Sequence, residues 1–255
     1  MNSSDNNPLT QGIIVGADNA VEWLLPWWWY HYSSHNTLPV VFFDFGLSEQ
    51  AKLWCKEKGT LIPITPELSL LPIASSLVSL WEKTIGPGLW KVRSQWFKKP
   101  FACLASPFTK TLWIDLDCEI RGSLSPLFQE TRPHFSIAAE SDSCQHHFQT
   151  QGLTYPDEIT YNSGVIAFTK NHPILLDWKT EVCQKNNLHM GDQNALSRVL
   201  WNKKHPFTSL AIKYNWDPNL GPNTEALIFH WSAMSGKKQI YEQIMVLSSL
   251  SHLFS

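Results

Sequence analysis

The chain has 255 residues, with 20 basic and 22 acidic side chains and a formal net charge of −2. This length suits one large domain or two small ones. The lack of a basic excess argues against electrostatic binding of nucleic acid, which needs a positively charged surface. Thirteen tryptophans, 13 phenylalanines and 6 tyrosines provide enough apolar surface to offset the entropy lost on folding, which argues against disorder.

Residues 1–10 are polar and predict a flexible tail without the basic and apolar regions of a secretory signal. No apolar run reaches the ~18 residues of a membrane span. The five cysteines form no CxxC pair, which favours reduced core thiols over a disulfide framework or a zinc site. We therefore expect a cytoplasmic protein without a transmembrane segment.

The first half of the chain predicts strands that alternate with helices. Apolar runs predict strands at 12–17, 39–45 and 61–64. A helix is expected over 22–32, and another between a cap at Ser48 and Gly59. Residues 65–88 contain several prolines and predict mostly loop. Residues 89–106 predict a helix that Pro100 either kinks or starts anew.

The second half continues the pattern and ends in a helix. Strands are expected at 111–117, 134–139, 159–168, 210–214 and 226–231, and helices at 173–186 and 191–203. An amphipathic helix covering 239–255 would pack on the domain. The alternation favours one α/β domain over 11–238, with a mixed, mostly parallel central sheet flanked by helices. Such sheets bind ligands beyond the carboxyl ends of their strands.

Two carboxylates, Asp115 and Asp117, end the strand expected at 111–117. In an extended chain, residues i and i+2 point to the same side, where two carboxylates repel unless a cation lies between them. Oxygen ligands in low number suit Mg²⁺ or Mn²⁺, which keep waters and recruit substrate phosphates. A solvated acidic loop after a strand is the alternative.

Several short motifs around this pair occur in a characteristic order. The segments 99–108 (KPFACLASPF), 110–117 (KTLWIDLD) and 124–128 (LSPLF) resemble the core of metal-dependent GT-A glycosyltransferases. They are most similar to glycosyltransferase family 8, the glycogenin and bacterial galactosyltransferase group. The segments 12–18 (GIIVGAD), 161–165 (YNSGV) and 191–196 (GDQNAL), and a late histidine, His230, fit the same family. The resemblance covers residues 12–238.

The resemblance implies a single GT-A domain, similar to a Rossmann fold, that moves a sugar from a nucleotide-sugar donor, a UDP sugar, to an acceptor. The acceptor could be a glycan, a lipid, a protein or a small molecule, and family 8 enzymes retain the anomeric configuration. Asp115, Asp117 and His230 would hold Mn²⁺ or Mg²⁺ on the donor diphosphate. Ala17 and Asp18 would contact the nucleoside, and Lys99 would lie near the donor sugar or its phosphates. The reacting sugar and the acceptor would be lined by Asn162, Asp192 and Gln193.

The sequence departs from the family after His230. The family usually has a glycine three positions after this histidine and a lysine six positions after it. Here Ala233 is at the third position, and Gly236-Lys237-Lys238 comes one residue late. We expect Lys237 to bind the diphosphate, with Lys238 as the alternative.

Other interpretations stay open for these residues. Asp18 and Asp192 could each cap a helix, and His230 could be a hydrogen-bonded core residue. A phosphatase of the haloacid dehalogenase type also has a D-x-D motif after a strand, but it wants Thr or Val where Glu119 stands, and its motif normally opens the chain. A non-catalytic carbohydrate-binding or interaction protein on the same fold is a third possibility.

Aromatic and histidine clusters outside these motifs have simpler explanations. Trp27, Trp28 and Trp29 would cover ~200° of a helix, which favours core packing. A stacking platform for a sugar, or a partner or peripheral contact shared with the C-terminal helix, is the alternative. His134 and the pair His146-His147 lie in an expected polar loop without ligand spacing, so we do not assign them to a metal.

Overall fold

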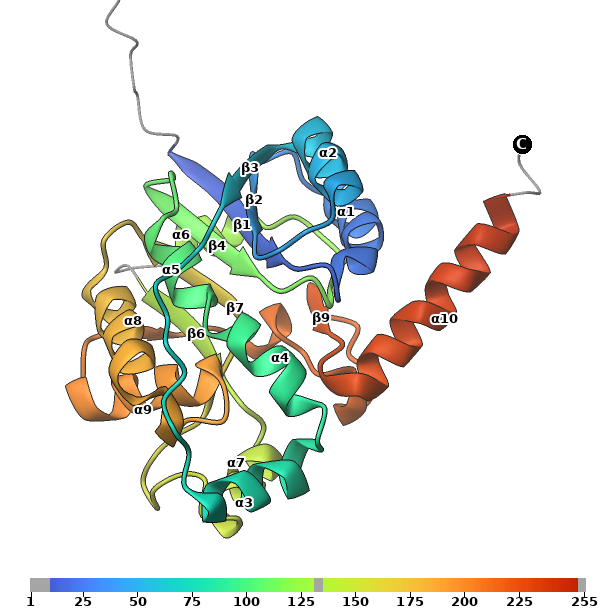
Figure 1. The fold of residues 1–255 in the computed structure, drawn as a ribbon. Coiled ribbons are helices and arrows are strands. Elements are labelled where there is room, and N and C mark those ends of the chain that lie inside the picture. The colour runs from blue at the N-terminus through green and yellow to red at the C-terminus, as the bar shows by residue number, and fades with distance from the viewer. Residues whose placement is uncertain (1–9, 131–134, 252–255) are drawn as a thin grey trace, which may run out of the picture.

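Seven strands form the central sheet, in the order β3-β2-β1-β4-β7-β6-β8 (Figure 1). The computed structural model describes residues 10–130 and 135–251. The strands β1 (Gln11–Ala17), β2 (Val40–Asp44), β3 (Thr60–Pro63) and β4 (Lys110–Ile114) run parallel. β7 (Tyr161–Thr169) is antiparallel to β4 and to β6 (Phe135–Ala139), and β8 (Thr208–Ser209) is parallel to β6. The prediction of an α/β domain with a mixed, mostly parallel sheet is confirmed.

Helices cover both faces of the sheet, because successive strand residues point to opposite faces. Ile13 and Val15 of β1 pack on one side against α1 (Leu25–Ser33), with α2 (Glu49–Lys58) and α6 (Ser125–Glu130) beside it. Ile14 packs on the other side against α5 (Lys99–Leu104), α8 (Pro173–Lys185) and α9 (Asp192–Lys203). Ser48 caps α2 by accepting a hydrogen bond from the amide of Ala51, as predicted.

The tryptophan run of α1 belongs to the core. Trp27 is 3% exposed and Trp28 is fully buried. Trp28 stacks on Tyr32 with ring centroids 5.0 Å apart, and Trp29 packs, partly buried, against the same cluster. The core interpretation of the run is therefore confirmed for Trp27 and Trp28.

Two expected loops are helices instead. The segment 65–88 contains α3 (Ser75–Ile85), whose Trp81 is buried against Leu89 of α4 (Leu89–Trp96). It begins without a side-chain cap, so the usual start signal is missing from the sequence. The segment with His146 and His147 is α7 (Asp142–Thr150), which buries no residue and therefore has no apolar period.

Two of the strand predictions also need correction. The expected strand at 111–117 ends at Ile114, and a turn over 115–117 separates β4 from the next strand, β5 (Cys118–Ile120). β5 leaves the main sheet and pairs antiparallel with β9 (Ile228–His230). The expected strand at 210–214 is a 3-10 turn over Ile212–Tyr214, which follows β8. Of the two alternatives for Pro100, the structure has the second: Pro100 lies in the first turn of a separate helix, α5.

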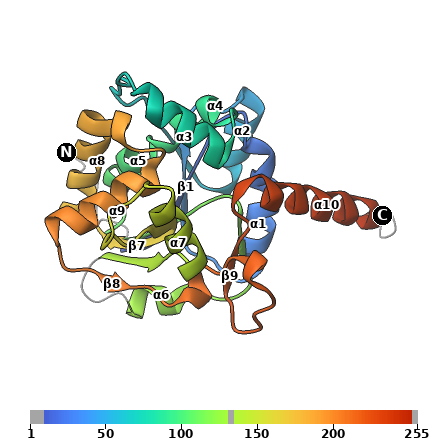
Figure 2. The ribbon, with the colours of Figure 1, turned by 90° about the horizontal axis from the view of Figure 1, so that it is seen from below.

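The last helix, α10 (Ala233–Ser251), begins six residues before the predicted start at Gln239. Figures 1 and 2 show it running outward from the body of the domain. Near its start Ile240 is buried, and Gln243 accepts a hydrogen bond of 3.1 Å from Trp27 Nε1. No helix in the described ranges is both long and apolar enough to cross a membrane. Residues 1–9 of the predicted tail, His134 and residues 252–255 lie outside the described residues.

Candidate functional site

The two carboxylates of the D-x-D motif lie where the sheet changes from parallel to antiparallel pairing. Asp115 directly follows β4, and its amide donates to the carbonyl of Gly164 in β7 over 2.8 Å. Asp117 lies in the turn before β5, where the amide of Cys118 donates to the carbonyl of Asp115 over 3.1 Å. The prediction assumed an extended chain here and is wrong in that detail. A turn presents the two side chains.

Lys99 joins Asp115 to the start of α9. Its Nζ is 3.0 Å from Asp115 Oδ1, 3.4 Å from Asp192 Oδ2 and 3.1 Å from Ser163 Oγ. Lys99 is only 7% exposed. Burial lowers its pKa, but the charges of Asp115 and Asp192 outweigh burial and raise the pKa above its usual value. The ammonium therefore stays charged inside the site.

Asp115 is held from a second side by Trp113, whose Nε1 donates to Asp115 Oδ1 over 2.6 Å. Burial raises the pKa of Asp115, and the Lys99 ammonium opposes that effect. The tryptophan of the strand that carries the motif thus fixes the first carboxylate directly.

Both oxygens of Asp117 face nitrogen atoms. His230 Nε2 is 3.3 Å from Oδ1, and Lys237 Nζ is 2.7 Å from Oδ2. Burial alone would raise the pKa of Asp117, but Lys237 and the hydrogen bond with His230 hold it well below the usual range. Burial lowers the pKa of His230, but its hydrogen bond with Asp117 outweighs this and raises it. Positive charge is therefore concentrated around Asp117.

The orientation of His230 depends on two neighbours. Its Nδ1 is 3.0 Å from Asn215 Oδ1, and donation to this amide oxygen leaves Nε2 directed at Asp117. Gly164 lies against the ring, where a Cβ would come within 2.2 Å of His230 Cε1. Glycine is required here because the imidazole packs directly on the backbone of β7.

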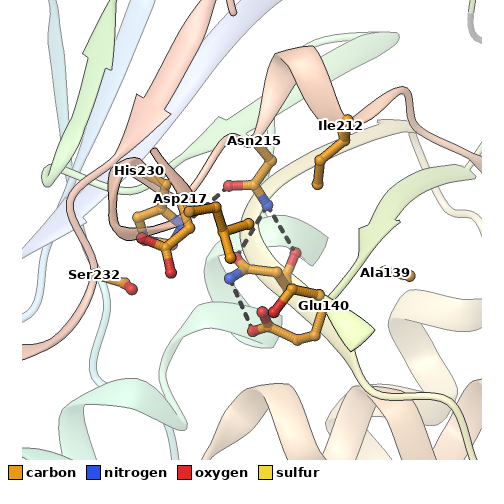
Figure 3. A pocket seen from close by; sticks show the side chains of 10 residues that line it. Ala139, Glu140, Ile212, Asn215, Asp217, His230 and Ser232 are labelled. Carbon is orange, nitrogen blue, oxygen red and sulfur yellow. Dashed lines mark hydrogen bonds between the residues drawn. The ribbon is translucent and has the colours of Figure 1, made fainter. Parts of the chain in front are cut away.

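A polar network extends from this histidine along the end of β7 (Figure 3). Asn162 Oδ1 accepts a hydrogen bond of 3.0 Å from Asn215 Nδ2. Glu140 Oε1 accepts from Asn162 Nδ2 over 2.9 Å and from Gln193 Nε2 over 2.8 Å. Burial raises the pKa of Glu140, although the hydrogen bond from Gln193 opposes this. Glu140, Asn162 and Asn215 line a small pocket whose wall also includes Asp217 and Ser232.

Asp18 follows β1, and its Oδ1 accepts a hydrogen bond of 3.1 Å from the amide of Ala20. This bond closes a local turn and does not cap a helix, because the next helical turn begins at Glu22 with Val21 at its N-cap and no side-chain cap. The capping interpretation of Asp18 is therefore wrong. Contact of Ala17 or Asp18 with a nucleoside stays a prediction.

No protein-family model matches the sequence, and no curated protein matches it. Solved structures do match. Galactosyltransferase LgtC, in complex with donor and acceptor sugar analogues, is 14% identical with a TM-score of 0.59, over 91% of this chain and 94% of that one. Glycosyltransferase GlyE of Streptococcus pneumoniae is 17% identical with a TM-score of 0.54, over 88% and 55%. Mouse xyloside xylosyltransferase 1 is 15% identical with a TM-score of 0.53, over 87% and 97%. The chain has the GT-A fold. At these identities the likeness is one of fold.

The ligand set of the GT-A site fits a divalent cation. Potential ligand atoms of Asp117, Cys118 and His230 all lie within 4.8 Å of one another, and the three residues are largely buried. A carboxylate and an imidazole are ligands that Mn²⁺ and neighbouring transition metals accept. Asp115, the other predicted ligand, is not in this group.

The predicted residues therefore form three connected groups. One joins Asp117, His230 and Lys237, the second joins Lys99, Asp115 and Asp192, and the third joins Asn162 and Gln193 through Glu140. Our sequence reasoning missed Ser163, Asn215, Glu140 and Cys118 as parts of the site. Glu140 could have been predicted from the sequence, because it directly follows β6 and ligands of α/β sheets bind beyond such strand ends.

The backbone geometry after His230 shows which of the two lysines, Lys237 or Lys238, reaches the site. Ala233, at the position where the family has glycine, takes a left-handed conformation with φ of 62°. The chain turns there into α10, and Lys237 in the first part of that helix reaches Asp117. The Lys238 side chain is 79% exposed and is 3.9 Å from Glu242. Lys237 is thus the lysine that reaches the site.

Proposed function

We propose that the protein is a metal-dependent glycosyltransferase that moves a sugar from a nucleotide sugar, specifically a UDP sugar, to an acceptor. The observation that carries the proposal is the pairing of two carboxylates, the partly buried Asp115 and the buried Asp117, with Lys99, Lys237 and His230 at the carboxyl edge of a GT-A sheet. Such a cluster suits a diphosphate and its counter-ion, because both need fixed charges in a place that excludes water.

Charge builds on the diphosphate oxygens as the bond from sugar to phosphate breaks. A divalent ion, Mn²⁺ or Mg²⁺, held by Asp115, Asp117 and His230, would supply positive charge to those oxygens when bound. Lys237 would exchange its contact with Asp117 for a diphosphate oxygen, and Lys99 would face the donor sugar or its phosphates. Ala17 and Asp18 would contact the nucleoside.

We assign the sugar and acceptor side to Asn162, Asp192 and Gln193. Asp192 lies at the start of α9, where Lys99 and Ser163 hold its carboxylate. Gln193 and Asn162 are fixed by a common hydrogen-bond acceptor, Glu140 Oε1. Rigid amides of this kind suit orientation of sugar hydroxyls. We propose retention of the anomeric configuration on the resemblance to family 8.

Two other functions have less support. A phosphatase of the haloacid dehalogenase type would place its D-x-D motif after the first strand of the chain, whereas here the motif follows β4. A non-catalytic carbohydrate-binding protein would not need buried charges, which are costly to maintain without a function. The transferase explains both the position of the pair and the burial of Asp117.

The test is turnover of nucleotide sugars by the purified full chain. With Mn²⁺ present, we expect binding and slow hydrolysis of at least one member of a panel of UDP sugars and other nucleotide sugars. Asp117→Asn should abolish both, and Asp142→Asn, at an acidic residue of α7 outside the site, should change neither. Failure of the wild-type protein to bind or hydrolyse any member of the panel would refute the proposal.

A further inference from the structure

The sulfur of Cys118 lies among the expected metal ligands, although nothing in the sequence motifs assigns it there. Cys118 begins β5 and is the direct partner of His230 in the antiparallel pairing of β5 with β9. Side chains of residues directly opposite in such a pair lie on the same face, with Cβ atoms about 4.5–5.5 Å apart. The thiol and the imidazole are therefore neighbours by strand register.

The Cys118 sulfur makes little polar contact within the described part of the chain. Cys118 is completely buried. Among the described residues, its sulfur has one hydrogen-bonding contact, a long one of 3.9 Å to the carbonyl oxygen of Gly164. The carboxylate of Asp115, by contrast, is engaged by Lys99 and by the indole of Trp113.

We propose that Asp117, Cys118 and His230 together bind a thiophilic divalent ion, with the Cys118 thiolate as one ligand. Their potential ligand atoms lie within 4.8 Å of one another. A metal with ligand bonds of about 2.0–2.3 Å holds neighbouring ligand atoms about 3–4.5 Å apart, so small side-chain rotations complete the site. Asn215 already fixes the His230 ring with Nε2 directed at Asp117.

A sulfur ligand changes which ion the site prefers. An oxygen-only set suits Mg²⁺ and Mn²⁺, whereas thiolate favours softer ions such as Co²⁺ and Zn²⁺. When the ion binds, the S–H bond of Cys118 is replaced by a sulfur–metal bond, the proton passes to water, and no oxidation occurs. The inference rests on the proposed function, because it adds a sulfur ligand to the site that would hold the ion of the transferase.

The test is spectroscopic and does not depend on turnover. The full chain, freed of metal by a chelator, is titrated with Co²⁺, and absorption from thiolate-to-Co²⁺ charge transfer is recorded in the near ultraviolet. We expect this band in the wild-type protein and in Cys55→Ser, and its loss in Cys118→Ser. The pair is matched because Cys55 is also fully buried but lies in α2. Cys118→Ser should lower the affinity for Co²⁺ and Zn²⁺ at least tenfold and change the affinity for Mg²⁺ less than threefold.

The wild-type spectrum alone can overturn the inference. Binding of Co²⁺ without the band, or no binding of Co²⁺ at all, refutes the sulfur ligand whether or not Cys118→Ser folds. A band that persists in Cys118→Ser also refutes it. Turnover of a UDP sugar with Mn²⁺, without a thiolate band in the Co²⁺ titration, would support the transferase and refute the sulfur ligand. A band without turnover of any nucleotide sugar would support the metal site and count against the transferase.

Discussion

Gly164→Ala should disable the proposed metal site by a purely steric effect. An alanine Cβ at this position would lie 2.2 Å from His230 Cε1 and 2.5 Å from its Nδ1. Carbon atoms in contact are normally about 3.5–4.0 Å apart, so the imidazole would have to move by more than about 1 Å. That shift would break its alignment with Asp117 and with Asn215.

The expected loss follows from the cost of overpacking. Forcing one extra carbon into a packed site costs about 1–3 kcal/mol. If the ring relieves this strain by leaving the position that binds metal, metal affinity falls about 5- to 150-fold. Hydrolysis of the UDP sugar at a fixed, limiting Mn²⁺ concentration should fall in proportion.

The assay is the rise in melting temperature on addition of Mn²⁺, together with hydrolysis at several Mn²⁺ concentrations. Gly88→Ala is the matched control, because a Cβ there meets no atom within 4 Å and Gly88 has a helical φ of −63°. The control should keep the full response. If Gly164→Ala shows a wild-type Mn²⁺ titration while remaining folded, the position of the His230 ring does not govern metal binding and the reasoning is wrong.

Three further predictions concern the charge around Asp117, the core and the last helix. Lys237→Ala should raise the KM for the nucleotide sugar at least tenfold, because the substitution removes a charge beside the diphosphate position. The control Lys238→Ala should change this KM less than twofold. Equal effects of the two variants in steady-state kinetics would contradict the assignment of Lys237. Trp28→Ala should lower the free energy of unfolding by about 3–5 kcal/mol. Tyr30→Ala, at a side chain 56% exposed, should lower it by no more than about 0.5 kcal/mol. Denaturant titration measures both values, and similar losses would refute the assignment of the tryptophan run to the core. Ala233→Gly should raise the free energy of unfolding by about 1 kcal/mol, because it removes the steric cost of a left-handed alanine; a loss of stability in the same titration would mean that this strain is absent.

Local patterns predicted most strands and helices around the site. The apolar runs before Asp18 and Asp115 mark β1 and β4. Ser48 marks the start of α2, because its side chain accepts a hydrogen bond from the amide of Ala51, only three positions further along the chain. These features need no distant partner. The missed helices α3 and α7 lacked that information, because one has no side-chain cap and the other buries no residue.

The tertiary structure decided how the motifs combine. Asp117 and His230 are 113 positions apart and meet only because β5 pairs with β9 away from the main sheet. Asn215 orients the histidine from the position directly after a 3-10 turn, Ile212–Tyr214, which our prediction assigned to a strand. No local pattern encodes such a contact, since it depends on the register between segments that are distant in the chain.

The sequence by itself determined the fold class, the D-x-D position and the identity of the charged residues, because hydrophobic period and residue chemistry are local properties. Only the tertiary structure decided that the acidic pair lies in a turn, that Lys237 rather than Lys238 meets Asp117, and that the Cys118 sulfur lies close to Asp117 and His230. Strand pairing and the left-handed turn at Ala233 set those positions, and both arise from packing between segments that the sequence keeps far apart.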